Sequence, residues 1–380
     1  MGWELNSEDT QYVRSIESFA KAELAYDPRP FQEGGRINKT AWEKCADFGI
    51  LGGLVPLAYG GGAKSLTAYV AGMQALGRHC LDSGLLFAIC AHVFACVMPL
   101  SIYGSQDQKE KWLRRLCQGS AVAAIAIAEE QGASDAFGMT TTASAKDGGV
   151  VLNGEKTYVT NAPFCDVVFA YAVLKDKPGN IAVCIVERGA AGVSFSEPVK
   201  KMGLGSAPFG RIVFTDCFVA PESVLSRKDN GKMIFMNAME WERGCILAPV
   251  VGVMERQLEG CVGYLKARTQ GGVPLSKKQV LSHRVVDMRM RLELSQLILC
   301  NYVKKKEKDR RAHIEASMAK LYISESFLQN SLDAVQLHGA FGYTERLEYE
   351  SLLRDSIGVR IASGTSDIQK EIIAHSLRLT

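Results

Sequence analysis

The chain has 380 residues, of which 47% are apolar, so it can bury a large core and divide into two or three domains. Its 44 basic and 41 acidic residues are mixed along the sequence and give a net charge of +3, so no global field favours nucleic acid or an anionic membrane. The eleven cysteines are spread singly, and the first 24 residues lack the pattern of a signal peptide. We therefore expect a cytoplasmic protein with reduced thiols.

Residues 7–117 carry apolar side chains at helical spacing, interrupted by Pro-Arg-Pro at 28–30 and by three glycines at 60–62. This pattern predicts an α-helical domain over residues 1–119. Within it, residues 83–103 form an apolar run of membrane-spanning length. Because the run contains His92, two cysteines and Pro99, we favour a buried core helix over a membrane span.

The pattern changes near residue 120, where short apolar runs rich in β-branched residues begin. Residues 150–152 and 157–160 flank Asn153-Gly154, which predicts a hairpin turn between two strands. Further short strands are expected at 167–169, 181–185 and 211–214. These runs predict a β domain over residues 120–228.

Helical periodicity returns at Gly231 and continues to the C-terminus, with breaks near 270–276 and 339–342. The length of these segments predicts a bundle of about four helices over residues 229–380. A helical part, a strand-rich part and a second helical part together define an α+β class.

Several common site signatures are missing from the sequence. No glycine-rich dinucleotide fingerprint follows a strand, neither a P-loop nor HExxH occurs, and the six histidines have no metal-ligand spacing. We therefore expect no metal site.

The predicted helix that contains Glu240 and Glu242 offers a candidate base. Residues two apart on a helix point in nearly opposite directions, so only one of the two is expected to face inward. Glu242 shares its face with an apolar stripe, whereas Glu240 shares its face with more polar residues. Burial raises the pKa of a carboxyl group and makes its ionised form a stronger base toward a carbon-bound proton. The alternative is a glutamate paired with a basic side chain of a neighbouring helix.

Three polar segments are candidates for ligand contacts. The small-residue loop 129–135 suits a phosphate group, although an ordinary surface loop has the same composition. The strand end 158–161 carries hydroxyls and an amide that could meet a polar ring edge, or simply form a turn. The segment 363–367 precedes an amphipathic helix and can serve as its N-cap or bind an anion.

In order and together, these features resemble the acyl-CoA dehydrogenase family over nearly the whole chain. The motifs that carry the resemblance are NGEKTYVTNAPFCD at 153–166, KARTQGGVPLSKKQVLSHRVVDM at 266–288, and VQLHGAFGY, LLRD and SGTSDIQKEIIA toward the C-terminus. The resemblance implies an acyl-CoA dehydrogenase-like fold with an N-terminal helical domain, a middle β-barrel and a C-terminal four-helix bundle. It also implies a homotetramer that binds FAD partly at a subunit interface.

The resemblance also assigns residues to the cofactor. Tyr158 and Thr160 would lie against the isoalloxazine ring, Ala128 would offer backbone donors near its pyrimidine end, and Ser134 would approach the pyrophosphate. The positions that would hold the FAD of the same or a neighbouring subunit are Arg268, Gln279, Gln336, Gly339, Thr365 and Asp367.

Departures from the family pattern carry information about the base. Most members place the catalytic glutamate directly before the Gly-Thr of the C-terminal signature, where this chain has Ser363. A minority, such as isovaleryl-CoA dehydrogenase, places it in a Glu-Arg pair 26 residues before the arginine of the second motif, and Glu242 has that separation from Arg268. Ala128, Gly271 and Ala340 also differ from the usual residues, so some cofactor contacts would be altered.

The runs at 82–100, 239–245 and 363–374 resemble a subgroup of dehydrogenases that oxidise prolyl or similar groups on peptidyl carrier proteins in natural-product pathways. This subgroup implies a phosphopantetheine-bound thioester and a peptidyl or acyl carrier protein as partner. The basic run 304–311 is either a docking patch for an acidic carrier or a solvated helix end. Two other functions remain open, namely oxidation of an ordinary short or branched acyl-CoA and flavin-free binding of an acyl group or carrier.

Overall fold

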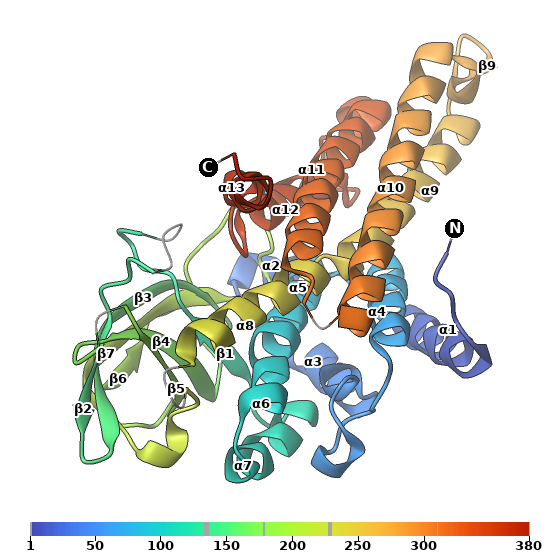
Figure 1. Cartoon of the computed structure of the whole chain (residues 1–380). Coiled ribbons are helices and arrows are strands. Elements are labelled where there is room, and N and C mark those ends of the chain that lie inside the picture. Colours follow the sequence, from blue (N-terminus) through green and yellow to red (C-terminus); the bar gives the residue numbers. More distant parts are fainter. Residues whose placement is uncertain (1, 133–136, 178, 227–229, 310, 380) are drawn as a thin grey trace.

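The computed structural model describes residues 2–132, 137–177, 179–226, 230–309 and 311–379. Two helical parts flank a curled sheet in chain order, as the sequence and the resemblance predict (Figure 1). The N-terminal helices are α1 (Ser7–Glu23), α2 (Arg29–Gly34), α3 (Lys39–Asp47), α4 (Leu66–His79), α5 (Ser83–His92), α6 (Met98–Tyr103) and α7 (Gln106–Cys117). Side chains of Asn6, Asn38, Ser65, Asp82 and Ser105 cap the N-termini of five of them.

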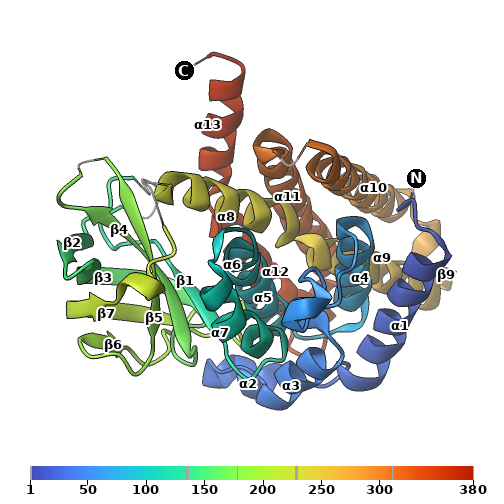
Figure 2. The same ribbon diagram turned by 60° about the horizontal axis from the view of Figure 1, so that its bottom comes forward.

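The apolar run that begins at α5 lies in the interior of the protein. A π-helical turn, Val93–Val97, joins α5 to α6. The resulting segment Ser83–Tyr103 has a mean hydropathy of 2.3 over an 18-residue window, and 89% of that window is buried inside the protein. It is the one helical segment among the described residues that is long and apolar enough to cross a membrane. Its burial matches the expected core helix, and Figure 2 shows it between the sheet and the C-terminal helices.

The sheet has seven strands in the order β1-β4-β2-β3-β7-β6, with β5 paired to β4. The strands are β1 (Ala123–Ala126), β2 (Thr142–Lys146), β3 (Gly149–Thr160), β4 (Val167–Leu174), β5 (Ile181–Glu187), β6 (Val193–Phe195) and β7 (Phe209–Val219). Strand β4 is buried almost throughout because β1, β2 and β5 all pair with it.

The predicted hairpin turn at Asn153-Gly154 is wrong. Both residues lie inside β3, at a register shift against β7, where Gly154 has a φ of 139°. The hairpin between β2 and β3 turns instead at Asp147 and Gly148, which both have positive φ values and form the turn that this geometry favours. An Asn-Gly pair also suits a β-bulge, so the local sequence alone did not separate the two.

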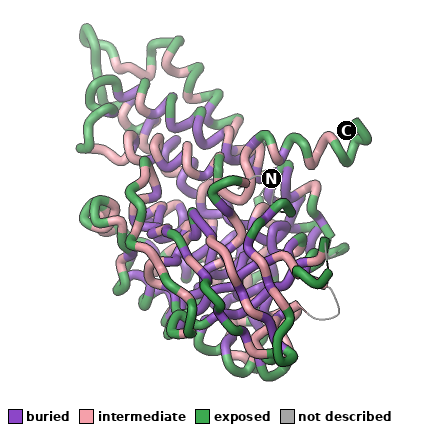
Figure 3. The backbone as a smooth tube through the Cα atoms, turned by 90° about the vertical axis from the view of Figure 1, so that its left-hand side faces the viewer, coloured by how far each residue is buried: buried purple, intermediate pink, exposed green. Residues whose placement is uncertain are grey.

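The C-terminal helices are α8 (Gly231–Cys245), α9 (Ala248–Ala267), α10 (Gln279–Asp309), α11 (His313–His338), α12 (Tyr349–Ile361) and α13 (Ser366–Ser376). A small hairpin of β8 (Thr269–Gln270) and β9 (Val273–Pro274) connects α9 to α10. Helices α9, α10 and α11 lie side by side, and α4 packs along α9. Buried residues are concentrated in the centre of the molecule, whereas the helix that leads to the C-terminus projects into solvent (Figure 3).

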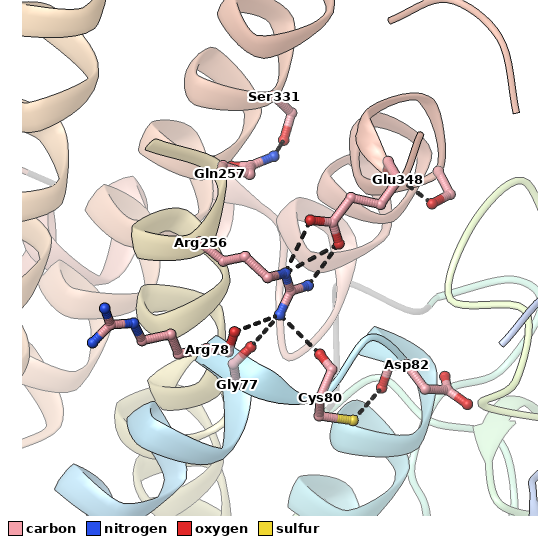
Figure 4. Close-up of polar contacts among 9 residues, drawn as sticks. Gly77, Arg78, Cys80, Asp82, Arg256, Gln257, Ser331 and Glu348 are labelled. Carbon is pink, nitrogen blue, oxygen red and sulfur yellow. Dashed lines mark hydrogen bonds and ion pairs between the residues drawn. The ribbon is translucent and has the colours of Figure 1, made fainter. Parts of the chain in front are cut away.

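One arginine joins the N-terminal helices to the C-terminal ones (Figure 4). Arg256 on α9 binds the carboxylate of Glu348 through Nε and Nη2 at 2.9–3.1 Å. Its Nη1 donates to the carbonyls of Gly77, Arg78 and Cys80 at the end of α4. The guanidinium therefore caps one helix and anchors the start of α12 at the same time.

Candidate active site

The C-terminal half of helix α8 is enclosed by other elements, whereas Met233 and Met236 in its first half are about half exposed, at 51% and 48%. It packs against α11, α10, β5, α6 and the π-helical turn. Close approach depends on two glycines, because a Cβ at Gly231 would meet the carbonyl oxygen of Ile181 at 1.9 Å and a Cβ at Gly244 would meet the ring of Tyr302 at 2.0 Å. A helix in this position buries charged side chains on more than one face.

Both glutamates of α8 are consequently buried, with 7% of Glu240 and 8% of Glu242 exposed. The prediction that only one of them faces inward is wrong, because it assumed a solvent-exposed side of the helix. Glu240 forms an ion pair of 2.6 Å with Lys306 on α10 and accepts a hydrogen bond of 3.0 Å from the backbone N–H of Ala312. The alternative of a glutamate paired with a neighbouring helix therefore describes Glu240.

Glu242 has a different partner. The hydroxyl of Ser363 donates a hydrogen bond of 2.7 Å to its Oε1. Burial raises the pKa of Glu242 above that of an ordinary glutamate, while the Ser363 hydrogen bond and the charges of Arg243 and Lys320 lower it. The net effect is a raised pKa, which gives a stronger base in a site that excludes water.

The neighbouring cations donate to backbone carbonyls. Arg243 Nε donates to the carbonyl of Ser363 at 3.0 Å, and Lys320 Nζ donates to the carbonyl of Arg360 at 2.7 Å. Burial lowers the pKa of Lys320 to about 7. Sequence analysis missed Lys320 as a neighbour of Glu242, because nothing in the local sequence indicates where a lysine side chain points.

The C-terminal signature lies beside this carboxyl group. Ser363 adopts a left-handed φ of 58° and Gly364 one of 93°, so the chain turns sharply before α13. Thr365 caps α13 through a 3.3 Å hydrogen bond from the N–H of Ile368 to its Oγ1. Asp367 lies in the first turn of α13, and 86% of its side chain is exposed. The predicted N-cap is confirmed, and the same end faces solvent, where an anion can approach.

A second set of candidates gathers at the end of β3. Tyr158 has a φ of 55° and is 55% exposed, with its ring 5.8 Å from that of Phe209. Thr160 is half-buried, and Val159 between them is buried at 2% exposure. The backbone N–H of Thr157 donates to the carbonyl of Ala128 at 2.9 Å, which brings Ala128 to the same place. Ser134 lies outside the described residues.

The first acidic residue of the loop 129–135 has a structural role. Glu129 is buried and accepts hydrogen bonds from Thr140, Thr141 and the Lys156 ammonium group, the last at 2.8 Å. Burial opposes ionisation of Glu129, but these hydrogen bonds outweigh it and lower its pKa to about 2. The pair holds Glu129 against β3, whereas residues 133–135 of this segment lie outside the described residues. Sequence analysis missed Lys156, which is fully buried and charged within a strand.

The end of β3 fits a planar polar ring. It presents a half-exposed aromatic side chain in a strained conformation, as is common at ligand sites. Thr157 Oγ1 and Asn161 Oδ1 are buried there and have no hydrogen-bond partner among the described residues. Similar unpaired atoms occur elsewhere among the described residues, so the fit of a ring rests on the half-exposed Tyr158 and the half-buried Thr160.

The remaining candidates form a separate group at the far end of the C-terminal helices. They are all exposed, and they are Arg268, Gln279, Gln336 and Gly339. The rings of Tyr264 and His338 lie 4.2 Å apart, which places the end of α11 beside the end of α9. From Lys320, near the base, to Gln336 the helix α11 advances about 24 Å. Within one chain, this group therefore lies far from Glu242.

The basic run 304–311 is largely engaged in ion pairs. Lys304 binds Glu4 at 2.7 Å, Lys305 binds Asp309 at 2.6 Å, and Lys306 binds Glu240. These contacts weaken the interpretation of the run as a docking patch. Among the described residues, no group of three or more histidine, cysteine, aspartate or glutamate side chains is arranged to hold a metal ion.

Comparison with known proteins covers all three parts of the chain. Family descriptions match in chain order: "Acyl-CoA dehydrogenase, N-terminal domain" at residues 6–120, the middle domain at 124–217 and the C-terminal domain at 229–378. These matches agree with the two helical parts and the intervening sheet.

Individual proteins are also similar over most or all of their length. An L-prolyl-[peptidyl-carrier protein] dehydrogenase from Pseudomonas fluorescens is 38% identical over 341 residues, which is 89% of this chain and 90% of that protein. The prolyl acyl carrier protein oxidase AnaB has a TM-score of 0.95 and 37% identity, covering 98% of this chain and 99% of its own. PigA with FAD and proline has a TM-score of 0.96 and 35% identity, with both chains fully covered.

Proposed function

The chain belongs to the acyl-CoA dehydrogenase family, and from that premise we propose that it is an FAD-dependent dehydrogenase of a thioester carried by a peptidyl carrier protein. The substrate is a prolyl or similar aminoacyl group on the phosphopantetheine arm. The observation that carries the proposal is the carboxyl group of Glu242, which is buried, has a raised pKa and is hydrogen-bonded to a hydroxyl group. The similarity to prolyl-carrier enzymes supports the choice of substrate.

In this reaction Glu242 removes the proton from the carbon next to the thioester carbonyl. The carbonyl acidifies that carbon, and exclusion of water keeps the carboxylate reactive. When bound, FAD would serve as the acceptor of a hydride from the adjacent carbon. The protein supplies the base, the orientation and the dry surroundings. The raised pKa of Glu242 also lets it hold the proton afterwards.

The residues at the end of β3 are proposed to hold the flavin. Tyr158 and Thr160 would line the ring, and Ala128 would offer its backbone. Thr365 and Asp367 lie at the exposed start of α13, next to the turn that contacts Glu242. We include Ser134 in this group on the family pattern alone.

The distant group, Arg268, Gln279, Gln336 and Gly339, is proposed to serve the FAD of a neighbouring subunit. A homotetramer would bring such a group to the cofactor of another copy. Helix α10 carries a stripe of exposed apolar side chains suited to association between copies. The stripe consists of Val286, Met290, Leu294 and Leu297, which are 57%, 54%, 42% and 41% exposed.

We keep the division into domains at 1–119, 120–228 and 229–380 as part of the proposal, and we place the protein in the cytoplasm. All eleven cysteines are free thiols, and ten of them are buried, as expected in a reducing compartment.

The test is mass spectrometry of a prolyl-loaded carrier protein incubated with the purified enzyme, beside Glu242→Gln and a short acyl-CoA. A loss of two or four hydrogen atoms from the prolyl group, absent with Glu242→Gln, is the expected result. Turnover of acyl-CoA without any change on the carrier would overturn the carrier-bound substrate. A colourless protein that does not take up FAD would overturn the dehydrogenase and favour an acyl- or carrier-binding protein.

A further inference from the structure

Two consecutive side chains of α8 contact one residue of the turn before α13. Ser363 Oγ donates to Glu242 Oε1 at 2.7 Å, and the Ser363 carbonyl accepts from Arg243 Nε at 3.0 Å. Gln369 Nε2 donates to the same carbonyl at 3.2 Å and to that of Gly364 at 2.9 Å. The turn is therefore fixed against the helix through both its hydroxyl and its backbone.

The conformation of Ser363 is unfavourable for its residue type. A φ of 58° is left-handed, a region in which non-glycine residues other than asparagine and aspartate are uncommon. Glycine would adopt this conformation without strain, and glycine does occupy the next position. A serine at 363 thus carries a backbone penalty that glycine would avoid. Its hydroxyl, aimed at Glu242, is the feature that glycine lacks.

We propose that Ser363 is a positioning residue, which holds the carboxyl group of Glu242 toward the substrate by one hydrogen bond that persists through proton transfer. The inference rests on the proposed function, because it assigns a task to the serine in that reaction. Most family members have the catalytic glutamate at this position, and the inference assigns a separate role to the serine that replaces it.

A hydroxyl group suits both protonation states of the base. Before the reaction, the Ser363 O–H donates to the carboxylate. As the substrate C–H bond breaks, its proton forms an O–H bond on Glu242, and the electron pair stays on the acyl group. The new carboxylic acid can then donate to Ser363 Oγ, whose own hydrogen rotates away. Backbone N–H groups and cations cannot make this reversal because they only donate.

Other groups around Glu242 do not duplicate this role. Arg243 on the same helix and Lys320 on α11 lower its pKa by charge, and both donate to backbone carbonyls. Cys96 in the π-helical turn and Tyr171 on β4 also interact electrostatically with Glu242, and burial raises the pKa of each, so both stay neutral. Among the described residues, Ser363 is the one whose side chain forms a hydrogen bond with the carboxyl group itself, at 2.7 Å.

The test compares Ser363→Ala with Ser363→Gly on the holoenzyme. Both remove the hydroxyl, but only glycine relieves the left-handed strain, so a purely structural role would affect the two variants differently. We expect kcat to fall about tenfold in both, as for loss of a hydrogen bond to a charged group. The acidic limb of kcat/KM should also move to higher pH in both, because the hydrogen bond that lowers the pKa of Glu242 is gone.

A matched control lies three residues away. Ser366 Oγ donates to Glu325 Oε1 at 2.5 Å, so Ser366→Ala removes an equivalent hydroxyl-carboxylate contact from the same segment. It should leave the acidic limb where it is. Melting temperatures of all variants separate changes in folding from changes in the base.

Each outcome has a separate meaning. If the wild-type enzyme oxidises neither the loaded carrier nor an acyl-CoA, the proposed function fails. If the wild type is active and the acidic limb is unchanged in Ser363→Ala and Ser363→Gly, the positioning role of Ser363 is overturned. A shift in the alanine variant alone would also overturn it, since the cause would then be backbone strain.

Discussion

Helix α8 carries two glutamates that differ by two positions and by one percentage point of exposure, at 7% and 8%. Glu240 faces an ammonium group, that of Lys306, at 2.6 Å. Glu242 faces a hydroxyl group, that of Ser363, at 2.7 Å. The cations nearest to Glu242 donate to the carbonyls of Ser363 and Arg360. Equal burial therefore produces a neutralised structural pair on one side of the helix and a basic carboxylate on the other.

The comparison shows that the partner, and not the burial, decides what a buried carboxyl group can do. Removal from water makes any carboxylate more basic, but an ion pair restores the stability of its charge. Around Glu242, the charges of Arg243 and Lys320 still lower the pKa of the carboxyl group. Both side chains, however, donate hydrogen bonds to backbone carbonyls. The following changes test this difference, beginning with the largest expected effect.

Exchange of each carboxylate for an amide should separate the two sites by activity. Glu242→Gln has nearly the same shape but cannot accept a proton, so kcat should fall about 10³-fold, within the range for loss of a general base. Glu240→Gln should keep activity within a few-fold at temperatures where it remains folded. Single-turnover loss of hydrogen from the loaded substrate measures both. Comparable losses in the two variants would remove the distinction between the sites.

For stability, the variant of Glu240 should show the larger effect and the variant of Glu242 the smaller one. Glu240→Gln leaves the buried charge of Lys306 without its carboxylate, which costs about 3–5 kcal/mol in free energy of unfolding. Denaturant unfolding measures the loss. The double variant Glu240→Leu/Lys306→Met should recover most of it, because replacing both partners of a buried pair is often neutral. No loss in the single variant would show that the pair is not structural.

The sequence predicted the burial of Glu242 but not its surroundings. The apolar stripe beside Glu242 and its separation from Arg268 both lie within a short stretch of chain, so local periodicity and the family resemblance were sufficient. The burial of Glu240 depends on Lys306 of α10 and on the backbone at Ala312, which come from a distant part of the chain. An amphipathic argument assumes that one side of the helix faces solvent, and it fails in the C-terminal half of α8, where other elements cover more than one side.

The local sequence was likewise insufficient to predict the turns of the sheet. The positions of most strands followed from their β-branched runs, and the two helical parts followed from their periodicity. The turn at Asp147-Gly148 and the bulge at Gly154 have similar local chemistry, and only pairing with β7 distinguishes them. Lys156 and Lys320 gave no signal either, because a charged residue reveals its burial only through partners that are remote in sequence.

Lys320 offers a finer test of the comparison, because its charge acts on Glu242 without pairing with it. Lys320→Met removes a cation that lowers the pKa of Glu242, so the acidic limb of kcat/KM should move to higher pH by less than in the Ser363 variants. Stability should change as well. The folded pKa of Lys320 is about 7, below that of a free lysine, so the wild-type protein becomes more stable as pH rises from about 7 toward 10. This rise should be absent in Lys320→Met, as melting temperature against pH will show.

The smallest effect concerns the stability of Glu242→Gln. The folded pKa of Glu242 is raised, so the native state holds its proton at pH values where the unfolded chain has lost it. Ionisation of the native carboxyl group therefore costs stability as pH rises above the value for an ordinary glutamate. Glutamine avoids this cost, and Glu242→Gln should melt at a higher temperature than the wild type near pH 8 and at a similar one near pH 4. Glu240→Gln, measured in parallel, should be the less stable protein near pH 8. A Glu242→Gln variant that is destabilised near pH 8 would mean that the carboxylate stabilises the fold, as Glu240 does, and would contradict its assignment as a base with a raised pKa.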